Sequence, residues 1–148
     1  MRPAVFAAIF AALYAAHQVA DHWVQTQHQA DTKGQPGWPG RRACADHVAS
    51  YTATSIFALY LVAWRTGIHL DDMRVGAGLA VSAVSHYLAD RRTPLARLAG
   101  WLGSGRFYQL GAPRPGRDDN PSLGTGAYAL DQSWHITWLL ATALIITG

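Results

Sequence analysis

The charges of this chain are gathered in a few short stretches, and this segregation limits the folds that it can adopt. Charged residues and prolines concentrate in residues 31–42, 65–74 and 91–121, and the stretches between them are almost uncharged. The helices of a soluble bundle would each carry a charged outer face. Long apolar stretches that alternate with charged loops are instead typical of a multi-pass membrane protein.

Four long segments are expected to be helical, and they predict an all-α fold, a four-helix transmembrane bundle. We expect these helices at about 3–29, 41–65, 72–90 and 126–147, in one integral membrane domain that covers residues 1–148. Each has about 20 residues, roughly enough to cross a hydrocarbon core ~30 Å thick. A soluble or peripheral four-helix bundle is the alternative interpretation, because each segment also contains polar residues.

Glycine and proline mark the connections between these segments. Residues 34–40 (GQPGWPG) cannot continue a helix and predict a loop. A short amphipathic helix is expected at about 94–102, where it would lie along the membrane surface. A Gly/Pro-rich loop then fills residues 103–124, between the third and fourth long helices.

Basic residues in the loops predict the orientation of the chain. The first and third loops share a surplus of positive charge: Lys33, Arg41, Arg42, Arg91, Arg92, Arg97, Arg106, Arg114 and Arg117. The positive-inside rule then places both loops at the cytoplasmic face of a bacterial cytoplasmic membrane. The first apolar segment resembles a secretory signal peptide, but His17, Asp21 and Gln25 within it favour a retained helix.

Composition argues against several classes of function. The net charge is +3, but no helix carries a basic stripe interleaved with aromatic residues, so nucleic-acid binding is not expected. Cys44 is the only cysteine, which excludes an internal disulfide and a CxxC zinc motif. The partners expected are therefore membrane lipids and, for a role in transport, further copies of the same chain.

Three of the predicted helices carry a histidine and an aspartate four residues apart. The pairs are His17/Asp21, His86/Asp90 and Asp131/His135, and His47 lies near the beginning of the second helix. Residues at this spacing are neighbours on one helix face. In an up-down topology all of these groups fall at the same depth, near the first and third loops. Charged groups at membrane depth face partners inside a bundle, so a shared site is predicted.

A divalent metal centre, with zinc as one candidate, is the leading interpretation of that site. Imidazole and carboxylate groups are its candidate ligands: His17, Asp21, His47, His86, Asp90, Asp131 and His135. His17, His86 and His135 could supply a three-histidine shell, and the surplus of ligands leaves room for a dinuclear site. A metal ion there would activate water for hydrolysis of a lipid headgroup or another ester. The catalytic candidates are Asp21, Asp90 and Asp131, with one of them as general base.

Two other functions stay open at this point. Chains of Asp and His also form proton relays, so the protein could handle protons or ions, although four helices would then need to oligomerise. A non-catalytic membrane partner in phage or mobile-element biology is the other alternative.

The ordered motifs resemble a known family. They are His17-x3-Asp21-x3-Gln25, Lys33, His47, His86-x3-Asp90 and Asp131-Gln132-x2-His135. This set, from about residue 11 to 138, resembles the small bacterial and phage membrane proteins catalogued as domain of unknown function 3307. The resemblance implies a multi-pass membrane protein and supplies no reaction. One departure is that a lysine commonly follows the third-helix Asp in that family, whereas Arg91, Arg92 and Thr93 follow it here.

Overall fold

The computed structural model describes residues 2–117 and 124–148, and this part of the chain is helical without any strand. The elements in chain order are α1 (Pro3–Val19), η1 (Ala20–Val24), α2 (Gln27–Thr32), α3 (Gly37–Thr66), α4 (Asp72–Asp90), α5 (Thr93–Trp101), α6 (Gly105–Tyr108) and α7 (Gly126–Thr147). The all-α prediction is confirmed.

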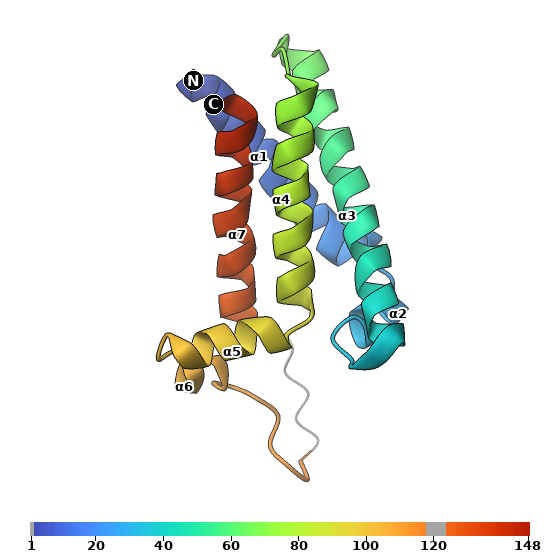
Figure 1. The fold of residues 1–148 in the computed structure, drawn as a ribbon, viewed down its shortest axis with the longest axis vertical. Coiled ribbons are helices and arrows are strands. Elements are labelled where there is room, and N and C mark those ends of the chain that lie inside the picture. The colour runs from blue at the N-terminus through green and yellow to red at the C-terminus, as the bar shows by residue number, and fades with distance from the viewer. Residues whose placement is uncertain (1, 118–123) are drawn as a thin grey trace.

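Four long helices form the body of the molecule (Figure 1). Helices α7, α4 and α3 stand side by side, and α1 crosses behind them. Each long helix packs against two others, in the cyclic order α1, α3, α4 and α7. Both chain termini lie at one end of the molecule, and α2, α5 and α6 lie at the opposite end.

The interior has an apolar half and a polar half. Apolar side chains fill the half near the termini: Ile9, Leu13, Leu59, Val75, Leu79, Leu139, Ala143 and Ile146. Polar side chains are buried towards α2 and α5: His17, His47, Ser82, His86, Asp90 and His135. The apolar half supplies the packing energy, and the polar half can serve chemistry.

The first helix ends earlier than the predicted boundary at residue 29, which was wrong. Helix α1 continues into the π-helical turn η1, the chain breaks at Gln25, and α2 then begins. A capping box causes this break, because the Thr26 hydroxyl accepts from the Gln29 backbone N–H at 3.2 Å. In return, the Gln29 side chain accepts from the Thr26 N–H at 2.9 Å. These reciprocal bonds start a new helix in a new direction.

The second long helix begins earlier than predicted. Residues 37–40 of the expected loop form the first turn of α3, where Pro39 is tolerated because its missing N–H has no intrahelical partner. A side chain at Gly40 would meet the Gln35 carbonyl oxygen at 2.0 Å, so glycine permits the turn and the helix to approach closely. The connection between α2 and α3 is therefore shorter than expected.

The remaining boundaries lie close to the predictions. Helices α4 and α7 have the predicted bounds, and α5 lies one residue before the surface helix expected at 94–102. The predicted loop at 103–124 contains the short helix α6. Residues 118–123 of this loop lie outside the described part of the chain.

Only one segment in the described residues, Pro3–Val24, is long and apolar enough to cross a membrane by composition. Core helices of soluble proteins and signal sequences meet the same criterion. Helix length and composition thus support one candidate span, not the predicted four. The other long helices contain inward-facing polar residues such as His47, His86 and His135, which lower their mean hydropathy.

Candidate metal centre

All seven residues predicted for the site lie in the polar half of the interior. They come from five helical segments that converge there: His17 from α1, Asp21 from η1, His47 from α3, His86 and Asp90 from α4, and Asp131 and His135 from α7. The four histidines are buried, and their rings or nitrogen atoms contact one another or the aspartates. Antiparallel packing of the helices produces this convergence.

Two imidazoles and two carboxylates form the tightest group. His47 Nε2 lies 3.0 Å from His86 Nε2, 3.4 Å from Asp21 Oδ1 and 3.4 Å from Asp90 Oδ2. His86 Nε2 lies 3.7 Å from Asp21 Oδ1 and 3.2 Å from Asp90 Oδ2. Three atoms that can ligate a metal, His47 Nε2, His86 Nε2 and Asp90 Oδ2, thus lie within 3.4 Å of one another, and Asp21 Oδ1 lies near both imidazoles.

The spacing of these three atoms matches three corners of a tetrahedral metal site. A tetrahedral zinc ion holds nitrogen and oxygen ligands at ~2.0–2.2 Å, which separates the ligands from each other by about 3.3–3.6 Å. The distances among His47 Nε2, His86 Nε2 and Asp90 Oδ2, 3.0–3.4 Å, lie close to that value. Asp21 Oδ1 and Asp90 Oδ2 are buried and accept no hydrogen bond from the described residues. Buried, unpartnered carboxylate oxygens are costly, and a cation between them removes that cost.

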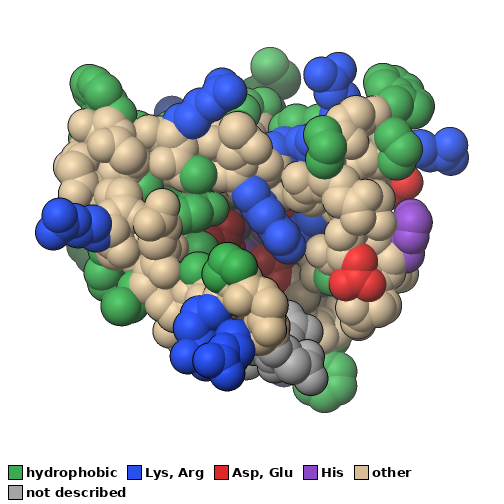
Figure 2. All heavy atoms as spheres, turned by 90° about the horizontal axis from the view of Figure 1, so that it is seen from below, with side chains coloured by type: hydrophobic (Ala, Val, Ile, Leu, Met, Phe, Trp, Pro, Cys, Tyr) green, Lys and Arg blue, Asp and Glu red, His purple; other side chains and the backbone are tan. Residues whose placement is uncertain are grey.

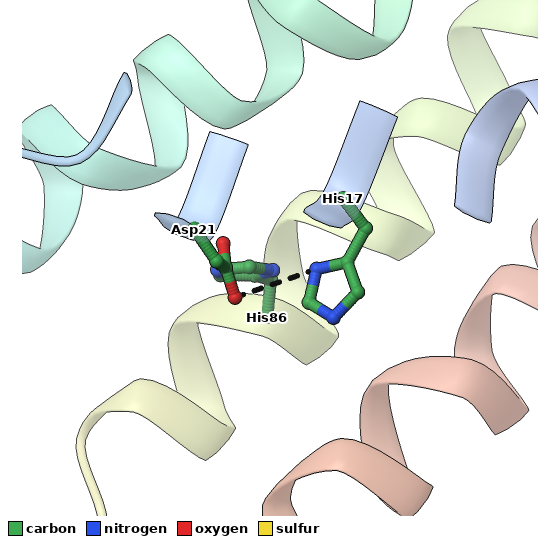
Figure 3. Close-up of side chains that lie close together, drawn as sticks. All are labelled: His17, Asp21 and His86. Carbon is green, nitrogen blue, oxygen red and sulfur yellow. Dashed lines mark ion pairs between the residues drawn. The ribbon is translucent and has the colours of Figure 1, made fainter. Parts of the chain in front are cut away.

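The other two histidines flank this group. His17 Nδ1 lies 3.4 Å from Asp21 Oδ2, and Figure 3 shows the two side chains pointing toward each other beside His86. The His135 ring lies 4.9 Å from the His17 ring and 4.3 Å from the His86 ring, centroid to centroid. The three-histidine shell expected from the sequence, His17, His86 and His135, is therefore not the closest set of ligands. In the closest set His86 lies beside His47, and His17 and His135 lie outside it.

Further ligand atoms surround the tightest group. Asp90, Asp131 and His135 each offer an atom within 4.8 Å of the others, and so do His17, Asp21 and His86. His135 Nδ1 faces the Asp131 backbone carbonyl at 2.8 Å and its carboxylate at 3.5 Å. The groups share His86 and Asp90, so the arrangement has enough ligands for a second ion.

Lys33 completes the site, and its contacts were not predicted from the sequence. Its ammonium lies 2.8 Å from Asp90 Oδ1 and donates to Gln25 Oε1 at 2.6 Å. By pairing with one oxygen of Asp90, Lys33 leaves the other oxygen facing His47 and His86. Lys33 is the only lysine of the chain and stands among the ordered motifs, and these were the available signals.

Two further contacts hold the site in place. Arg91 donates from one guanidinium nitrogen to the Lys33 carbonyl and from another to the Gln35 carbonyl, which fixes the turn that carries Lys33. The Tyr51 ring stacks on His86 with centroids 4.1 Å apart, and its hydroxyl lies 2.6 Å from Ser82 Oγ. The orientation of His86 is thus set by an aromatic neighbour that is itself anchored.

Comparison with known proteins gives a family but no activity. The sequence profile described as Protein of unknown function (DUF3307) matches residues 9–148. The chain belongs to the DUF3307 family. No curated protein and no solved structure matches the sequence of this DUF3307 protein. The family resemblance seen in the motifs is confirmed, and the matched range contains every residue of the cluster.

The centre of the DUF3307 protein opens towards the end formed by α2, α5 and α6. Figure 2 views this end, where acidic side chains lie at the floor of a hollow and Lys or Arg side chains lie across it. Asp131 is 28% exposed, whereas the histidines around it are buried. His28 is exposed on α2 outside the cluster. Water and small solutes can therefore approach the acidic residues from this end.

Proposed function

We propose that this DUF3307 protein is a membrane-embedded, metal-dependent hydrolase. One observation carries the proposal: His47, His86 and Asp90 present three buried ligand atoms at mutual distances of 3.0–3.4 Å. Imidazole nitrogen and carboxylate oxygen together are typical ligands of zinc and other first-row divalent ions. Zinc is the best match to two imidazoles and one carboxylate at this spacing, because a catalytic zinc ion holds three protein ligands and an open position.

The residues around the centre have separate roles in this proposal. A bound zinc ion supplies Lewis acidity and lowers the pKa of water at the site. His47, His86 and Asp90 would act as ligands and would leave the fourth position of a tetrahedral ion for water. Asp21 Oδ1 lies 3.4 Å from His47 Nε2, and Lys33 balances the charge of Asp90. Asp131 lies on the exposed side beside His135, where it can accept a proton from water or substrate as general base. Ester hydrolysis at the membrane surface is the reaction that this set of groups suits.

The distribution of apolar side chains supports a membrane location for all four long helices. Large apolar side chains face outward from each of them: Val19, Ile56, Phe57, Trp64, Val84, Leu140 and Leu144. The interior meanwhile buries histidine and aspartate, the reverse of the usual soluble arrangement. The mean hydropathy of a helix counts inward and outward residues alike, so inward polar groups conceal an apolar outer face. We therefore propose a multi-pass transmembrane bundle, with its basic first and third loops cytoplasmic.

Elemental analysis tests the metal centre directly. Protein purified in detergent without chelators is expected to retain near-stoichiometric zinc, and His47→Ala or Asp90→Asn should lose most of it. His28→Ala is the matched control, because this histidine is exposed on α2 and should leave the zinc content unchanged. Wild-type protein that folds but holds no divalent metal would overturn the proposal.

A hydrolysis assay tests the reaction. Zinc-loaded protein is offered phosphoesters and acyl esters, and activity should disappear after chelation and return when zinc is added back. Asp131→Asn should retain zinc and lose activity, since its proposed role is in proton transfer. Zinc-independent activity, or full activity in the Asp131→Asn variant, would contradict the roles assigned here.

Proton handling is the second candidate, because the ionisable groups form a continuous chain. His17, Asp21 and His47 follow one another at 3.4 Å, and Asp90 and Lys33 extend the series. In liposomes this function predicts a proton flux by metal-free protein that Asp21→Asn abolishes. If liposomes that contain zinc-loaded protein show no proton flux, the hydrolase is favoured.

A further inference from the structure

Arg92 connects α4 to α5 in a backbone conformation that is unfavourable for any residue with a Cβ atom. Its φ is 57° and its ψ is −48°, and it is the only non-glycine residue in the described chain with positive φ. The Thr93 N–H donates to the Arg91 carbonyl at 2.6 Å and closes a three-residue γ-turn centred on Arg92. Turns of this hand are rare and strained, and glycine would adopt the conformation freely. Strain of this kind is concentrated at functional sites.

The Arg92 side chain lies at the mouth of the proposed metal centre. A Cβ atom added to Gly34 would lie 2.8 Å from both Cδ and Nε of Arg92, so the side chain lies directly against this glycine. Gly34 follows Lys33, whose ammonium contacts Asp90.

Arg92 is a cation at this end whose charge is not consumed by contacts with the described residues. Lys33 pairs with Asp90 and Gln25, and Arg91 donates to two backbone carbonyls. The Arg92 guanidinium makes no hydrogen bond or ion pair with the described residues, although it is exposed and carries five N–H donors. Figure 2 shows basic side chains across the hollow above the acidic floor.

We propose that Arg92 binds the phosphate group of the substrate at the mouth of the centre, an inference that rests on the proposed hydrolase function. Asp21, Asp90 and Asp131 repel anions, so an anionic substrate needs a cation at the entrance. The planar guanidinium donates two parallel hydrogen bonds to phosphate oxygens, and the remaining oxygens can face the metal. The substrate class is accordingly a phosphate ester, either a lipid headgroup or a soluble phosphate compound.

Phosphate binding by purified protein tests this inference. Inorganic phosphate is titrated into zinc-loaded protein in detergent by calorimetry, and zinc content is measured on the same samples. Arg92→Gln and Arg92→Gly should bind phosphate about 10-fold to 100-fold more weakly, and Arg92→Lys should retain part of the affinity. Arg97→Gln on the exposed face of α5 is the matched control and should bind as wild type does.

The glycine variant separates binding from folding. Arg92→Gly relieves the positive-φ strain, so it should melt at an equal or higher temperature than wild type while it loses phosphate affinity. A variant that loses phosphate affinity only because it unfolds would melt earlier, which would contradict the inference.

The outcomes distinguish this inference from the proposed function and identify the source of the phosphate. Equal phosphate affinity in wild type and Arg92→Gln, at unchanged zinc content, overturns the role of Arg92 and leaves the hydrolase intact. If wild-type protein holds no zinc as purified and takes up none when zinc is added, but still binds phosphate through Arg92, the hydrolase alone is refuted. Arg92-dependent binding to phosphatidic-acid vesicles together with weak binding of inorganic phosphate assigns a lipid substrate. Arg92-dependent binding of inorganic phosphate together with weak binding to the vesicles assigns a soluble substrate. Acetate that binds as tightly as phosphate overturns the substrate class.

Discussion

Replacing Lys33 by methionine is predicted to destabilise the protein strongly, because it leaves the Asp90 carboxylate without its cation. The ammonium lies 2.8 Å from Asp90 Oδ1, and the two side chains are only 12% and 5% exposed. Methionine retains most of the length of the lysine side chain and removes the charge. The change therefore tests the ion pair with little loss of packing.

The size of the effect follows from burial. Removing one partner of a buried ion pair costs about 3–5 kcal/mol, since the other charge stays buried and uncompensated. Lys33 is partly solvated, and His86 Nε2 lies 3.2 Å from the other Asp90 oxygen, so we expect a loss of about 2–4 kcal/mol. For a chain of this size the loss lowers the melting temperature by roughly 5–15 °C.

This loss is measured by thermal melting in detergent, with circular dichroism as the signal. A chelator is present, so that no metal ion can compensate Asp90 in place of the lysine. Lys33→Arg should recover much of the stability. Arg42→Met is the matched control, because Arg42 and Asp46 are 3.9 Å apart on the surface, 76% and 61% exposed, and such pairs contribute little. A shift for Lys33→Met no larger than that for Arg42→Met would refute the reasoning. With zinc bound the shift should shrink, since the metal also compensates Asp90.

Three further predictions concern packing, anchoring and pH. Gly126→Ala should destabilise by more than about 2 kcal/mol in the same melting assay, because its Cβ would lie 1.5 Å from the Phe107 carbonyl oxygen; Gly76→Ala, with open space around it, should be neutral or stabilising. Tyr51→Phe should cost about 1–2 kcal/mol by leaving the Ser82 hydroxyl without its partner, while elemental analysis should find the zinc retained because the ring still stacks on a ligand. Bound zinc, measured after dialysis, should fall as the pH is lowered from about 8 to about 5, since protons compete for imidazole nitrogens; constant zinc across that range would argue against histidine ligands.

Helix boundaries were predictable where the capping residues are local. Asp71 accepts from the Met73 N–H at 2.9 Å and Thr125 from the Tyr128 N–H at 3.1 Å, so α4 and α7 begin where their sequences indicate. The capping box of Thr26 and Gln29 carried a signal of the same kind, and overlooking it produced the wrong end of the first helix. The start of α3 had no clear local signal, because a Gly/Pro run is common in loops.

The grouping of the site residues also followed from the sequence. Four-residue spacing puts His17 with Asp21, and His86 with Asp90, on one helix face. Antiparallel helices then bring the ends of successive elements to one level. Both facts depend on the helical repeat and on chain direction alone, so the depth and membership of the cluster could be predicted.

The tertiary structure alone decided which atoms meet. Three features depend on contacts between distant segments. His47 rather than His17 faces Asp90, and Lys33 pairs with the same carboxylate. Arg92 occupies a positive-φ turn beside Gly34. A helical repeat fixes the face on which a residue lies, but a contact of about 3 Å also needs the rotation of each helix and the rotamer of each side chain. Packing of the whole interior sets those quantities, and no local pattern contains them.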